Sequence, residues 1–265
     1  MTSEAALALL LRACVTAIDQ NLALFLESDA AEGPHKSRVA LRRLTTVLDG
    51  FQPLFRRKAW QRTRAEAKAI FRHLGKVRDA QVFLANLEAG ARNEKLAKAT
   101  DQLRDKVRRD LRRRRAVGFA PSLLRGLTDD SLLRRKAPGL ALRQMPVELL
   151  AAQSMETVHA ACLALGRDLA ALAVDDLHEF RKRMKSLRYL AEFFAPLWQH
   201  ADWPAQRRAL KDIQDALGEL NDQANARARG ATVDPQKALR AMQAAQKHWT
   251  ILMDAPTWWR NVQVS

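Results

Sequence analysis

Apolar residues recur every three to four positions along most of this chain, the spacing that places them on one face of an α-helix. Glycines and prolines interrupt the period repeatedly, as they do at helix ends. Ser3 is a candidate N-cap for the first helix. In the first part of the chain the period predicts four helices, at about residues 4–28, 35–52, 57–90 and 92–117.

Residues 118–146 break the period, and we expect a connector there with one short helical turn. Beyond it the period returns, with Asp175 and Asp234 as candidate N-caps and with Trp258 and Trp259 closing the core. Four more helices are predicted, at about 147–173, 176–195, 203–229 and 235–253. No segment alternates as a β-strand does, so the pattern predicts an all-α protein.

The chain also repeats itself, without gaps, at an offset of 143 residues. The matched pairs include His35 with His178, Arg38 with Arg181, Trp60 with Trp203, Leu74 with Leu217, and Asp79 with Asp222. A match of this kind predicts an internal duplication. We therefore expect one domain over 1–265, built from two pseudo-twofold-related four-helix bundles. Its first half would be 1–118, its connector 119–146 and its second half 147–265.

Charge narrows the range of partners. The chain has 45 Lys and Arg against 29 Asp and Glu, a net charge of +16, which attracts polyanions. The N-terminus lacks the basic region of a secretion signal, and we expect no membrane span and a cytoplasmic location. The two cysteines, Cys14 and Cys162, do not have the spacing of metal ligands. We therefore expect both to be small buried side chains of a protein in a reduced compartment.

Two repeated segments carry basic residues along one helical face, at steps of three, four and three. The first set is His35, Arg38, Arg42 and Thr45, and the second is His178, Arg181, Lys185 and Arg188. We call these sets the histidine-led stripes. Such runs are usually only a solvated helix face. Because basic residues recur at matched positions and a histidine heads each set, we favour binding of phosphate-rich anions.

The helix after each stripe repeats a second polar face. Its members are Arg64, Lys68, Arg72, Gly75 and Asp79 in the first half, and Arg207, Lys211, Asp215, Gly218 and Asp222 in the second. Glycine inside a helix costs about 1 kcal/mol relative to alanine. Gly75 and Gly218 therefore indicate close packing or a close ligand. We expect Asp79 and Asp222 to orient a basic residue of the facing helix.

These segments resemble a known family. HKSRVALRRLTTVLDGFQPLF (35–55) and LHEFRKRMKSLRYLAEFF (177–194) are similar to the two motif helices of the CHAD family, the conserved histidine α-helical domain. LGKVRDA (74–80) and LKDIQDALGELND (210–222) resemble the helices that follow them. The resemblance covers nearly the whole chain. It implies two similar four-helix bundles around a basic central groove or channel that binds inorganic polyphosphate without catalysis.

Carried over to matching positions, the resemblance implies a set of channel-lining residues. They are His35, Arg38, Arg42, His178, Arg181, Lys185 and Arg188, with Arg43, Lys68, Arg78 and Lys211 as additions. Thr45 stands opposite Arg188, so the first stripe departs from exact symmetry. We expect no catalytic residue, metal or cofactor. Family members are sometimes associated with polyphosphate or polyester granules, which makes granule association a further expectation. The Glu-x-Glu-x-Lys strand of a triphosphate-tunnel domain is absent, which favours a stand-alone module.

Other functions fit the sequence less well. Nucleic-acid binding by the same positive surface is the main alternative, but the chain has no recognisable motif for it and few aromatic residues for stacking. A phosphotransfer enzyme would need clustered carboxylates or a GxxxxGK[ST] loop, and neither is present. The block from Arg112 to Arg115 suits a solubilising helix end and a docking patch equally well.

Overall fold

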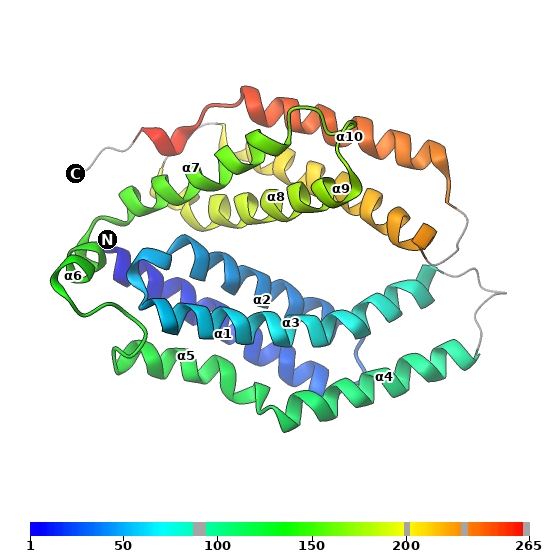
Figure 1. Cartoon of the computed structure of the whole chain (residues 1–265), viewed down its shortest axis with the longest axis horizontal. Coiled ribbons are helices and arrows are strands. Elements are labelled where there is room, and N and C mark those ends of the chain that lie inside the picture. The colour runs from blue at the N-terminus through cyan, green and yellow to red at the C-terminus, as the bar shows by residue number, and fades with distance from the viewer. Residues whose placement is uncertain (87–93, 199–201, 229–232, 262–265) are drawn as a thin grey trace. The chain divides into compact units, whose positions relative to one another are not determined.

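A computed structural model of the chain describes residues 1–86, 94–198, 202–228 and 233–261. These residues are mostly helical, and two isolated β-bridges are the only extended pairings among them. They form two compact units, Met1–Val147 and Glu148–Ser265 (Figure 1). The predicted all-α fold is confirmed, whereas the internal duplication stays a prediction.

Unit 1 is organised around its first two helices. Its helices are α1 (Ser3–Glu27), α2 (Glu32–Gly50), α3 (Arg57–Asn86), α4 (Glu94–Arg113), α5 (Phe119–Thr128) and α6 (Ala137–Gln144). α1 packs against α2 and α5, α2 packs against α3, and α3 packs against α4 (Figure 1). Leu11 of α1 and Leu41, Leu44 and Phe51 at α2 and its end are at most 1% exposed, so these apolar side chains lie in the core of unit 1.

The segment expected to be a connector with one helical turn contains two helices instead, α5 and α6. Pro121 and Pro138 lie in the first turns of these helices, where a missing backbone N–H is tolerated. Phe119 and Leu123 bury one face of α5, which packs against α1. The prolines therefore mark helix starts rather than an irregular chain.

Unit 2 has four longer helices and a C-terminal turn. They are α7 (Val147–Leu165), α8 (Val174–Phe194), α9 (Trp203–Ala228), α10 (Pro235–Asp254) and the 3₁₀ turn η5 (Trp258–Arg260). α9 packs against both α8 and α10. As predicted, Trp258 and Trp259 are buried, at 5% and 6% exposure. The Trp259 Nε1 and the Arg260 guanidinium both donate to Glu156, and these hydrogen bonds lower the pKa of that carboxyl to about 2.

The predicted helix starts are partly confirmed. Asp234 caps α10, because its side chain accepts a hydrogen bond from the Gln236 N–H at 2.9 Å. The N-cap of α1 is Thr2 rather than Ser3, and the N-cap of α8 is Ala173, with Asp175 inside the first turn. Asp175 still favours the helix there through the helix dipole.

One described helix, α1, is long and apolar enough to cross a membrane by length and composition, contrary to our expectation. This is a weak indication, because core helices and signal sequences pass the same test. In unit 1 the apolar face of α1 is buried, with Leu7, Leu11 and Ile18 at most 1% exposed.

Both cysteines are buried, as expected. Burial raises the pKa of the Cys14 thiol to about 11 and that of Cys162 to about 12. These values keep the thiols protonated and unreactive near neutral pH.

Candidate functional site

In unit 1, two arginines of the first stripe lie near an aromatic ring of the next helix. The Arg38 Cζ is 4.2 Å, and the Arg42 Cζ 5.1 Å, from the centroid of the Phe71 ring on α3. A guanidinium within about 6 Å of a ring centroid gains cation–π attraction. His35 is exposed at the start of the stripe, while both arginines are partly buried. The contact with α3 therefore holds the guanidinium groups in place.

Gly75 makes room for Arg38. A Cβ atom built on Gly75 would lie 2.1 Å from the Arg38 Nη1, far inside van der Waals contact. The prediction of close packing at this glycine is confirmed. At the matched Gly218, no atom of the described residues lies within 4 Å of such a Cβ, apart from its chain neighbours and the adjoining backbone of its own helix. Close packing therefore explains why a glycine stands at position 75, but it does not explain the glycine at position 218.

The other predicted residues of unit 1 are more dispersed. The charge of Arg43 acts on the Cys14 thiol of α1, so Arg43 lies on the side of α2 next to α1. Lys68 is exposed and lies one helical turn before Phe71 on α3. Arg78 is partly exposed and lies close to one turn beyond Gly75. The structure thus groups Arg38 with Arg42 but places Arg43 apart from them.

In unit 2, the second stripe meets the C-terminal half of α9. His178 Nδ1 is 3.3 Å from Asn221 Oδ1. Burial lowers the pKa of the Arg181 guanidinium, and the charge of Asp222 raises it. Asp222 therefore acts on a basic residue of the facing helix, as predicted. The Arg181 Nε is buried and has no hydrogen-bond acceptor in the described part of the chain.

The remaining predicted residues of unit 2 are less enclosed. Lys185 is partly exposed. The Arg188 Cζ lies 5.0 Å from the centroid of its neighbour Tyr189, and its Nε is 3.7 Å from Glu192 Oε1. Lys211 is exposed and pairs with Asp215 at 2.9 Å, a hydrogen bond that raises the pKa of the lysine. Lys211 thus forms an ion pair within its own helix, α9.

The two stripes differ at their last position, as the sequence indicated. The Thr45 hydroxyl donates to the Arg42 carbonyl at 2.8 Å, whereas Arg188 supplies a cation. Sequence reasoning missed Phe71 and Asn221. Phe71 lies three residues after Lys68 on the same helical face, so the period itself could have found it.

The comparisons with known proteins agree with this architecture. A family model for the CHAD domain matches residues 9–231. The chain belongs to the CHAD domain family. Among curated proteins, none matches the sequence.

Two solved structures share the fold of this CHAD domain. The CHAD domain from the plant Ricinus communis has a TM-score of 0.71 and 21% identity, covering 98% of this chain and 90% of that one. PptA from Streptomyces chartreusis has a TM-score of 0.60 and 16% identity, covering 98% of both chains. At such low identity the likeness concerns the fold alone.

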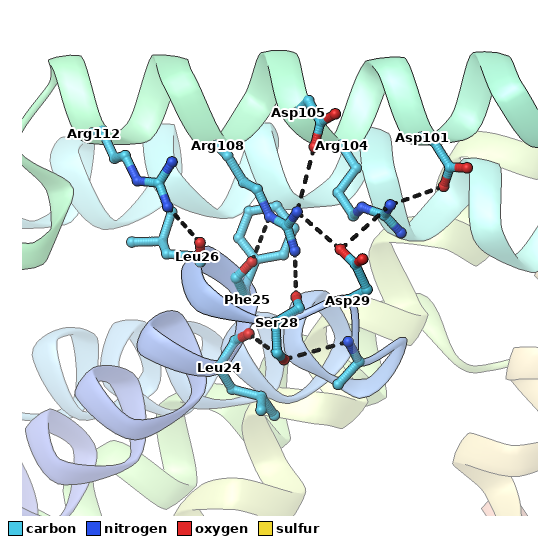
Figure 2. Close-up of polar contacts among 11 residues, drawn as sticks. Leu24, Phe25, Leu26, Ser28, Asp29, Asp101, Arg104, Asp105, Arg108 and Arg112 are labelled. Atoms are coloured by element: carbon cyan, nitrogen blue, oxygen red, sulfur yellow. Dashed lines mark hydrogen bonds and ion pairs between the residues drawn. The ribbon is translucent and has the colours of Figure 1, made fainter.

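The arginine-rich α4 of the CHAD domain binds the end of another helix. Arg104, Arg108 and Arg112 lie at successive steps of four and point toward the C-terminal end of α1 (Figure 2). The guanidinium groups of Arg108 and Arg112 donate to carbonyl oxygens at this helix end, whereas Arg104 pairs with the carboxylates of Asp29 and Asp101. The acceptors are Phe25, at 2.8 Å from Arg108 Nε; Leu26, at 2.5 Å from Arg112 Nη2; and Ser28, which accepts from Arg108 Nη2.

Some arginines in the block from Arg112 to Arg115 therefore have a structural role. Arg112 caps α1, and Arg113 pairs with Asp110 at 3.0 Å. Burial lowers the pKa of His73 on α3, and the charge of Arg114 lowers it further. Contacts within unit 1 thus account for Arg112 and Arg113 of this block.

Proposed function

We propose that this CHAD domain binds inorganic polyphosphate through its two histidine-led stripes and does not itself catalyse a reaction. One observation carries the proposal. At matched positions, Arg38 and Arg181 are both partly buried against the following helix instead of extending into solvent. Membership of the family supports the same conclusion.

The chemistry of these arginines suits a phosphate chain. A fixed guanidinium loses little side-chain entropy on binding and can donate two parallel hydrogen bonds to phosphate oxygens. The Arg181 Nε is a buried donor without an acceptor in the described residues, and such a donor costs about 1–3 kcal/mol. A phosphate oxygen would supply that acceptor. His35 and His178 are exposed at the start of each stripe and would extend the contact.

Charge reversal tests the proposal. Replacing Arg38→Glu together with Arg181→Glu should abolish retention of long-chain polyphosphate on a filter while helical circular dichroism stays unchanged. A matched control is Arg12→Glu with Arg227→Glu, which alters net charge equally at two exposed arginines outside the stripes. Retention that survives in the stripe variant, or is lost equally in the control, would rule out the stripes as the site.

Nucleic-acid binding is the alternative for the same positive surface. Competition separates the two: polyphosphate should displace bound RNA at equal phosphate concentration, and failure to do so would favour nucleic acid. Release of phosphate in the presence of Mg²⁺, lost in Asp79→Asn, would instead indicate an enzyme. A channel shared by the stripes, a cytoplasmic location and granule association stay predictions.

A further inference from the structure

The turn η5 is attached to the helices of unit 2 through side chains. Within the turn, the Arg260 N–H donates to the Thr257 carbonyl at 2.9 Å. The Trp259 Nε1 donates to Glu156 on α7 at 3.1 Å, and the Arg260 guanidinium donates to the same carboxylate at 2.7 and 2.9 Å. One carboxylate of α7 therefore holds two side chains of the turn.

A second side chain, Gln206 on α9, holds the start of this segment. Its Oε1 accepts from the Trp258 Nε1 at 2.7 Å, and its Nε2 donates to the Pro256 carbonyl at 3.1 Å. Gln206 is only 7% exposed, so these bonds lie inside unit 2. A three-residue turn held in this way can separate from the long helices without unfolding them.

A buried histidine lies against the turn. His159 on α7 is 5% exposed, and its ring centroid is 5.1 Å from that of Trp259, with the ring planes at 72°. The His159 Nδ1 is buried and has no hydrogen-bond partner in the described part of the chain. The ring borders a cavity of about 20 Å³, which has room for about one water molecule. His159 belongs to neither histidine-led stripe, so the proposed polyphosphate site does not use it.

The walls of this cavity suit an uncharged imidazole. Among the described residues, the charged groups that act on His159 are Glu156 of its own helix and Arg260 of the turn. Burial lowers the pKa of His159, the charge of Glu156 raises it, and the charge of Arg260 lowers it. The other helices contribute neutral side chains to the cavity: Leu187 and Ala191 from α8, Gln206 and Leu210 from α9, and Leu252 from α10.

Protonation would change what this cavity must accommodate. Both ring nitrogens of a protonated histidine are donors, so the His159 Nδ1 would become a charged donor without an acceptor among the described residues. Hydration of the ring would relieve this cost. The turn is the shortest wall of the cavity, and lifting it is the least disruptive way to admit water.

We propose that η5 is an acid-sensitive strap: protonation of His159 releases the turn from α7 and uncovers Trp258 and Trp259. The strap would keep this apolar surface covered near neutral pH and expose it in acid. This inference does not depend on polyphosphate binding.

The direction of the pH dependence follows from the two acid–base groups. Docking of the turn lowers the pKa of His159, so its stabilisation is complete above the ordinary histidine value of 6.5 and is lost as the pH falls below it. The Glu156 carboxyl, with a pKa of about 2 in the docked state, adds a further loss only below its ordinary value of 4.5. Release in mild acid therefore depends on His159.

The test follows the indole N–H signals of the ¹⁵N-labelled full chain between about pH 8 and about pH 5, the range in which histidine titrates. A soluble paramagnetic probe broadens the signals of exposed groups, and Trp→Phe substitutions assign the signals. Trp249 is an internal reference, because it is 0% exposed and donates to the Gly166 carbonyl in the same unit at 2.7 Å. The variant is His159→Phe, and its matched control is His248→Phe, at a histidine of α10 that is 24% exposed.

In the unsubstituted chain and in the control, the Trp258 and Trp259 signals should be lost to the probe as the pH falls below about 6.5, while the Trp249 signal persists. In His159→Phe all three signals should persist across the whole range. If His159→Phe has a lowered thermal midpoint at about pH 8, His159→Gln replaces it, because its side chain also carries no charge in this range.

Three results would overturn the inference. Protection of Trp258 and Trp259 down to about pH 5 in the unsubstituted chain would show that the turn stays docked. The same pH-dependent loss in His159→Phe would assign the response to another group. Simultaneous loss of the Trp249 signal would mean that unit 2 opens as a whole and that the turn is not a strap. None of these measurements involves polyphosphate, so they leave the proposed function unaffected.

Discussion

At the scale of single residues, the position of one guanidinium depends on two neighbours on α3. The Phe71 ring attracts the Arg38 cation, and the missing side chain of Gly75 leaves space for it. Because the atom nearest Gly75 is the far end of a flexible side chain, an added methyl group would displace Arg38 without breaking the core. Gly218 has no such neighbour among the described residues, so the pair offers a matched comparison.

We predict that Gly75→Ala weakens polyphosphate binding roughly fivefold, which corresponds to about 1 kcal/mol of lost cation–π positioning. Gly218→Ala should leave binding unchanged and should raise the free energy of unfolding by up to about 1 kcal/mol, because alanine favours helix. Binding titrations and urea denaturation of both variants measure these effects. Equal binding by the two variants would contradict the role given to Gly75.

At the scale of helices, α4 stabilises the end of α1. Arg108 reaches the Phe25 and Ser28 carbonyls and also pairs with Asp29 at 3.0 Å (Figure 2). Its side chain is only 12% exposed, so solvent screens these contacts weakly. Charge-assisted bonds to helix-end carbonyls are therefore a principal link between the two helices.

We predict that Arg108→Ala lowers the free energy of unfolding by about 2–3 kcal/mol, because it leaves the part-buried Phe25 and Ser28 carbonyls without their donor and removes the ion pair with Asp29. The neighbouring Arg109 is exposed, and Arg109→Ala should change stability by less than about 0.5 kcal/mol. Urea denaturation, followed by circular dichroism, measures the free energy of unfolding of both variants. A similar loss in both variants would mean that general charge reduction, not the contact with α1, is responsible.

At the scale of the whole molecule, the net charge of +16 overstates the charge available to a ligand. Residues 101–145 contribute a net +8, yet many of their arginines bind carbonyls or carboxylates within unit 1. Arg143, for example, pairs with Glu4 at 2.7 Å. In the second stripe, by contrast, the buried Nε of Arg181 has no acceptor among the described residues.

We predict that polyphosphate affinity falls steeply with salt, because each phosphate contact releases counterions. A plot of log affinity against log salt should be linear, and Arg38→Gln with Arg181→Gln should reduce its slope by about two. Titrations across a range of salt concentrations measure the slope. An unchanged slope in this variant would show that neither arginine contacts phosphate.

Much of the fold could be predicted from the sequence, because helical periodicity is a local property. The buried face of α2, with Leu41, Leu44 and Phe51, follows the three-to-four-residue apolar spacing from which the helices were predicted. The helices α5 and α6 were missed, since proline in a first turn looks the same in sequence as proline in a loop. The predicted ligand contacts of the stripes await the binding experiments.

By itself, the sequence determined the all-α class and most of the helices, which helical faces are basic and to which family the chain belongs. Tertiary structure alone decided what each of these cations contacts: Arg108 and Arg112 bind a helix end, and Arg38 lies over Phe71. The reason is physical. Spacing along a helix sets the direction of a side chain, but its partner depends on how distant segments pack together.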